Sequence, residues 1–189
     1  MIITNKFFNK YIFFILAFIC VSFSIFFALK TAWIIFLLLF YISAYFLIFK
    51  KQNIFTNRIE KLFIFWIFFY PFFNIFTLYI IQYDVIPHSY RIFNTIEHIG
   101  LIGSLSFIIY GFLIKLFSKL SYWECFLVLF AIIISIGIGI EVLQYMVRVF
   151  IFEPASVYKM AEYYSDTIFD TITNIISGIF WSLLVSYRK

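Results

Sequence analysis

The residues that could do chemistry are few in this chain, and several of them recur at helical spacing. Glu141, Gln144 and Arg148 follow the apolar run "CFLVLFAIIISIGIGI" at positions i, i+3 and i+7, so they share one face of a helix. A charged side chain near the middle of a bilayer costs about 2.5 to 3.5 kcal/mol. An acid inside such an apolar helix therefore indicates a functional site.

Two further stretches supply polar groups that we expect at the same depth. In "SDTIFDTITNIISG", Asp166, Asp170 and Asn174 recur every four residues and share one helical face. In "NTIEHIG", His98 stands at the start of another apolar run. The sequence thus predicts a polar cluster contributed by three helices, with these members: His98, Glu141, Gln144, Arg148, Asp166, Asp170 and Asn174.

Acid, amide, guanidinium and imidazole groups would allow this cluster to hydrogen-bond and charge-pair with a ligand. The alternative is that the same groups only pair with one another and hold a helix bundle together. No metal and no cofactor is predicted, because His98 is the only imidazole near the cluster besides His88 in a loop. No catalytic residue is assigned. We expect Arg148 to pair with Asp170, which would leave Glu141 protonated and able to donate a hydrogen bond.

Composition defines the class of protein that must position these residues. The 189 residues are 65% hydrophobic, 25% aromatic and 12% charged, whereas soluble domains are about 45 to 50% apolar. We predict an all-α, polytopic membrane protein. With about 20 apolar residues per crossing, it would have about six transmembrane helices, near residues 11–29, 32–49, 62–82, 98–117, 125–147 and 167–187.

Basic residues predict the orientation of these helices. Of the 14 Lys and Arg residues, only Lys30, Arg91, Arg148 and Lys159 fall on one side of the predicted membrane. The positive-inside rule then places both termini in the cytoplasm and the polar cluster in the outer leaflet. The net charge of +5 is explained in the same way, so no nucleic-acid partner is predicted.

Small residues predict which helices pack closely. They recur at intervals of three or four residues in three groups, Gly100, Gly103 and Ser104; Ala131, Ser135 and Gly139; and Gly178, Ser182 and Ser186. We therefore divide the chain into an N-terminal region, 1–90, and a region of three closely packed helices, 91–189. The stretch "ASVYKMAEYYS" is expected to form a short interfacial helix that covers the cluster.

"GIEVLQYMVR" followed by "SDTIFDTITNIISGIFW" resembles the paired Glu-x-x-Gln and Asp-x-x-x-Asn-x-x-Gly segments of VanZ-like membrane proteins, and "NTIEHIG" resembles an earlier helix of that family. The resemblance covers residues 91–185, with Ser177 standing where the family usually has Gly. It implies a multi-pass protein of the bacterial cytoplasmic membrane. The family takes its name from a protein associated with low-level resistance to the glycopeptide teicoplanin.

Three functions remain open at this point. The first is a non-enzymatic protein of the cell envelope whose outer-leaflet site binds a membrane lipid head group or another lipid-linked or cell-wall-related ligand. The second is a membrane-embedded enzyme that acts on a lipid-linked substrate, with Glu141, Asp170 or His98 as general acid or base. The third is a structural or assembly protein. An enzyme is the less favoured of these interpretations.

Overall fold

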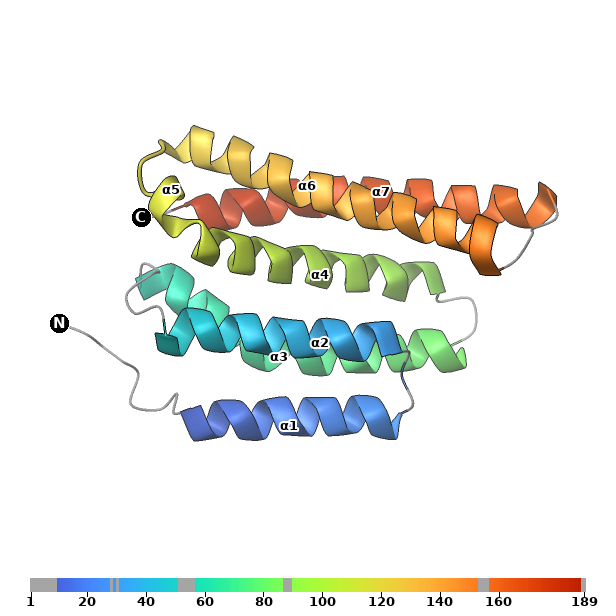
Figure 1. Ribbon diagram of the computed structural model, residues 1–189, viewed down its shortest axis with the longest axis horizontal. Helices are drawn as coiled ribbons and strands as arrows, with labels where there is room; N and C mark the ends of the chain where they lie inside the picture. Colours follow the sequence, from blue (N-terminus) through green and yellow to red (C-terminus); the bar gives the residue numbers. More distant parts are fainter. Residues whose placement is uncertain are drawn as a thin grey trace. The chain divides into compact units, whose positions relative to one another are not determined.

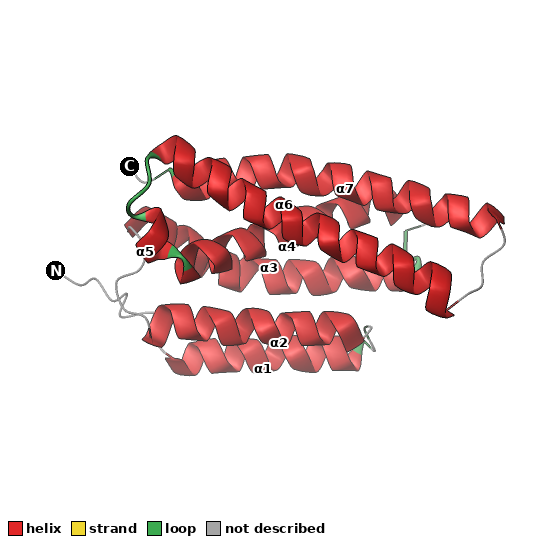
Figure 2. Ribbon diagram, turned by 45° about the horizontal axis from the view of Figure 1, so that its top comes forward, coloured by secondary structure: helices red, strands yellow, loops and turns green. Residues whose placement is uncertain are grey.

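The computed structural model describes residues 10–27, 29, 31–50, 57–86, 90–152 and 157–187. All regular secondary structure in these ranges is helical, as predicted (Figures 1 and 2). In chain order the helices are α1 (Lys10–Phe26), α2 (Thr31–Tyr45), α3 (Asn57–Tyr83), α4 (Tyr90–Phe112), the short α5 (Ile114–Phe117), α6 (Tyr122–Val147) and α7 (Val157–Ser186). A π-helical turn extends α2 over Phe46–Lys50 and α6 over Arg148–Phe152.

Four of the described helices are long and apolar enough to cross a membrane. They are Arg58–Tyr83, Arg91–Phe112, Tyr122–Phe150 and Met160–Ser186. The first two predicted spans are also apolar helices, Lys10–Phe26 and Trp33–Phe49, but they are shorter. The four long helices support a membrane protein, while six crossings and the cytoplasmic termini stay predictions.

The chain divides into two compact units, Met1–Glu97 and His98–Lys189, and the boundary falls within α4. In the first unit, α1, α2 and α3 pack against one another. Aromatic side chains fill this core: the Phe13 ring meets Tyr41 edge to face at 5.6 Å, and Phe40 meets Tyr70 at 5.8 Å between ring centroids. Such large side chains suit a packing role.

In the second unit, α6 and α7 lie side by side along much of their length (Figure 2). Ser121 begins α6 with a capping box, in which its hydroxyl accepts from the Glu124 backbone N–H while the Glu124 carboxylate accepts from the Ser121 backbone N–H. The indole Nε1–H of Trp181 on α7 donates to the carbonyl of Ile99 on α4 at 2.9 Å. The α6–α7 packing and this hydrogen bond connect α7 to α6 and to the part of α4 that belongs to this unit.

The small-residue pattern identifies two of the three packed helix faces. Gly100, Gly103 and Ser104 on α4 and Gly178, Ser182 and Ser186 on α7 are buried. On α6 the prediction is wrong, because Ala131, Ser135 and Gly139 are exposed. The buried face of α6 is displaced from this group and consists of Cys125, Leu129, Ile133, Gly137 and Glu141.

The predicted interfacial cap is not a separate helix in the described part of the chain. From Val157 onward the segment forms the first turns of α7, which continues without a break to Ser186. Tyr164, within this segment, is 59% exposed. Residues 155 and 156 of the predicted cap lie outside the described residues.

Candidate functional site

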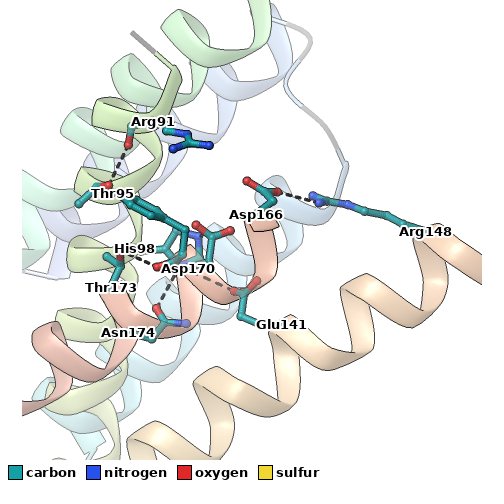
Figure 3. A network of polar contacts seen from close by, with 10 residues as sticks. Arg91, Thr95, His98, Glu141, Arg148, Asp166, Asp170, Thr173 and Asn174 are labelled. Atoms are coloured by element: carbon teal, nitrogen blue, oxygen red, sulfur yellow. Dashed lines mark hydrogen bonds and ion pairs between the residues drawn. The ribbon is translucent and has the colours of Figure 1, made fainter. Parts of the chain in front are cut away.

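Three helices of the second unit bring four polar side chains together in its interior. His98 comes from α4, Glu141 from α6, and Asp170 and Asn174 from α7. Their exposed fractions are 6%, 2%, 5% and 1%, respectively. We call these four residues the buried quartet, and Figure 3 shows their side chains pointing toward one another.

Helical periodicity explains why these side chains are inside. Glu141 is the last member of the buried face of α6, on which every fourth residue from Cys125 faces inward. Asp170 and Asn174 are also four residues apart, and both face inward on α7. Acids are almost never fully buried unless they are paired, so their contacts must account for their position.

The His98 imidazole lies at the centre of these contacts. Its Nδ1 is 3.0 Å from Oδ1 of Asn174 and 3.7 Å from Oε1 of Glu141. Its Nε2 is 3.5 Å from Oδ2 of Asp170. Asn174 therefore connects α7 to α4.

The hydrogen bond to Asn174 determines the tautomer of a neutral His98. An amide oxygen only accepts hydrogen bonds, so the ring proton must be on Nδ1. The Nε2 atom then carries a lone pair and faces the Asp170 carboxylate. Two electron-rich atoms in this position are stabilised by a cation between them, either a proton or a metal ion.

Arg148 pairs with Asp166 rather than with Asp170 as expected. Its Nη1 lies 2.9 Å from Oδ2 of Asp166, and its guanidinium lies 5.7 Å from the centroid of the Tyr163 ring. Asp166 is one helical turn before Asp170 on α7, so Arg148 pairs with the first of the two acids that were predicted to share this face. The protonation of Glu141, which was inferred from the other pairing, stays a prediction.

Gln144 does not join the buried quartet, although it was grouped with Glu141 by its i+3 spacing. Its side chain is exposed, whereas Glu141 is buried. A spacing of three residues corresponds to about 300° around a helix, so residue i+3 stands about 60° from residue i. That rotation is enough to turn Gln144 away from α7.

Gly137 is a site residue that the sequence reasoning missed. A Cβ atom added there would lie 3.3 Å from Nδ2 of Asn174, whereas one added at Gly139 would meet nothing within 4 Å. The absence of a side chain at Gly137 thus makes room for the amide. The sequence did contain an indication of this role, because Gly137 lies four residues before Glu141 and so shares its face of the helix.

The buried quartet also contains a possible set of metal ligands. His98, Glu141 and Asp170 each offer one donor atom, and these atoms all lie within 4.8 Å of one another. This arrangement is the only such group of three or more His, Cys, Asp or Glu side chains among the residues that the structure describes.

Comparisons of the chain with protein-family models, with curated proteins and with solved structures find no match. Interpretation of the site consequently depends on its own geometry.

Proposed function

We propose that this chain is a VanZ-like integral membrane protein of the bacterial cell envelope, and that the buried quartet binds the polar head group of a lipid or of a lipid-linked, cell-wall-related ligand. The observation that carries the proposal is the burial of His98, Glu141, Asp170 and Asn174 in mutual contact on apolar helices. Packing alone would be satisfied by apolar residues, since buried ion pairs seldom stabilise more than apolar isosteres do.

The hydrogen-bonding groups of these side chains restrict the class of ligand that the site could bind. Carboxylates accept hydrogen bonds from hydroxyl and ammonium groups, and the Asn174 amide can both donate and accept. Arg148, whose side chain is 39% exposed, would receive a phosphate further along α6. The ligand we propose is therefore a head group with a phosphate and with hydroxyl or amino donors. A role in teicoplanin resistance is part of this proposal through the family resemblance.

Lipids that remain bound after mild detergent extraction test this proposal. Mass spectrometry should find a phosphate-bearing lipid with the wild-type protein and much less of it with Glu141→Gln or Asp170→Asn. Glu162→Gln is the matched control, because Glu162 is an exposed acid on α7. If well-folded quartet variants retain the same lipids as the control, the quartet does not bind them.

An enzyme is the second candidate. One observation favours it: His98 lies between two carboxylates, 3.7 Å from Glu141 and 3.5 Å from Asp170. An imidazole oriented by a neighbouring acid is a common general base. Turnover of a bound lipid-linked substrate by the wild-type protein, and loss of turnover with unchanged lipid binding in His98→Gln, would identify an enzyme.

A further inference from the structure

We propose that His98, Glu141 and Asp170 form a binding site for a divalent metal ion of the zinc class. One donor atom from each residue lies within 4.8 Å of the others. The three residues come from three different helices, α4, α6 and α7. This inference goes beyond the proposed lipid ligand and does not depend on it.

The balance of charge supports a dication. Glu141 and Asp170 are both buried, and two carboxylates in an apolar interior are costly unless a cation compensates them. A divalent ion bound to a neutral imidazole and two ionised carboxylates would give the set a net charge of zero, whereas one imidazolium with two ionised carboxylates would leave a net charge of −1.

The position of Asn174 supports a metal-binding histidine. A histidine that binds a metal through one ring nitrogen almost always donates a hydrogen bond from the other to an outer group. Here Nδ1 lies 3.0 Å from Oδ1 of Asn174, which holds the proton there. The lone pair of Nε2 then faces Asp170, whereas Glu141 lies 3.7 Å from Nδ1 and would have to turn toward Nε2 to complete the site.

The donor types favour zinc over the harder cations. Magnesium and calcium prefer oxygen ligands alone, whereas zinc accepts imidazole nitrogen together with carboxylate oxygen. At zinc–ligand distances of about 2.0 to 2.2 Å, tetrahedral donors lie roughly 3.4 Å apart. The donors would have to approach one another from separations of up to 4.8 Å through rotations of their side chains.

Three protein ligands leave a fourth position open, as in zinc sites that bind water or substrate. The expectation of no metal depended on the scarcity of imidazoles, with His98 standing alone near the cluster. The structure supplies the missing ligands as carboxylates. A single histidine is therefore sufficient for the proposed site.

Equilibrium dialysis of the full chain in detergent, with the metal measured by inductively coupled plasma mass spectrometry, tests the site. The wild-type protein should bind one zinc ion per chain. Glu141→Gln and Asp170→Asn should lower the affinity at least about tenfold, and Asn174→Ala about 10- to 100-fold. Glu162→Gln should bind as the wild type does. A folded Asp170→Asn protein that binds zinc as tightly as this control would overturn the proposal.

Two measurements on the wild type keep the test decisive if a donor variant fails to fold. Zinc should raise its unfolding temperature in a concentration-dependent way, and cobalt should give the visible absorption of a tetrahedral nitrogen and oxygen site. No stabilisation and no such absorption would also overturn the proposal. Because neither measurement involves lipid, a failure of the metal site is distinguishable from a failure of the proposed head-group ligand.

Discussion

Replacement of Gly103 by alanine should strongly destabilise the second unit. A Cβ atom at this position would lie 2.6 Å from Cε2, 2.8 Å from Cζ2 and 3.0 Å from Nε1 of Trp181. Carbon atoms in favourable contact are about 3.5 to 4.0 Å apart, so the indole would have to move by nearly 1 Å. Trp181 is a rigid ring only 7% exposed, and it cannot avoid the new methyl group by rotating a flexible end.

The expected cost has two parts. Overpacking of a buried site typically costs about 1 to 3 kcal/mol. Displacement of the indole would also weaken its hydrogen bond to the Ile99 carbonyl, now 2.9 Å, which is worth about 0.5 to 1.5 kcal/mol. These two costs sum to roughly 1.5 to 4.5 kcal/mol of unfolding free energy, from which the gain of about 0.4 to 1 kcal/mol that alanine has over glycine must be subtracted.

Unfolding by SDS in mixed micelles, followed by circular dichroism, would measure this difference. Gly139→Ala is the matched control, because its Cβ would meet nothing within 4 Å, and it should raise the free energy of unfolding by about 0.4 to 1 kcal/mol through the lower entropy of the unfolded chain. His98 lies on the same helix as Gly103, so loosening α4 should also disturb the quartet. If Gly103→Ala and Gly139→Ala unfold at the same SDS concentration, the packing of Trp181 against α4 is refuted.

Three other predictions follow from the same contacts and from the charge distribution. Gly137→Ala should destabilise the protein less than Gly103→Ala, because the new Cβ would lie 3.3 Å from Asn174, compared with 2.6 Å from Trp181 at Gly103. When Asn174 is also replaced by alanine, the cost of Gly137→Ala should fall, and a double-mutant cycle would measure this difference. Asp166→Asn should lower the free energy of unfolding by at most about 1 kcal/mol, because it breaks an ion pair in which the Arg148 side chain is 39% exposed and the Asp166 side chain 24% exposed. Asp170→Asn should lower it by more, and equal effects of the two substitutions would contradict this ranking. In a variant without Cys20 and Cys125, an impermeant thiol reagent added to intact cells should label a cysteine at Glu162 and spare one at Ser118, and the reverse would contradict the predicted orientation.

The helical class and the polar residues could be predicted from the sequence because both depend on local patterns. Apolar runs of about 20 residues indicate membrane helices whatever their partners are. The four-residue spacing of Asp170 and Asn174 likewise predicts that they share a face, and both are buried. These features do not require knowledge of how the helices pack.

The partners of these residues could not be predicted in the same way. Arg148 could reach either acid of α7, and the choice of Asp166 depends on the axial offset between α6 and α7, which spacing within one helix does not determine. On α6, Gly137 and Gly139 are two residues apart and therefore face directions about 200° apart. Both glycines are present in the sequence, and only the packing of α6 against α7 shows that Gly137, not Gly139, lies at the helix contact.

Close helix packing and the buried quartet depend on each other in this unit. Helix axes separated by ordinary side chains are 8 to 10 Å apart, and an Asn side chain is short. Gly137 leaves room for the Asn174 amide at the α6–α7 contact, where its Oδ1 meets Nδ1 of His98 on α4. Gly103 similarly accepts the Trp181 ring between α4 and α7. The glycines therefore set the separations at which short polar side chains from three helices can meet.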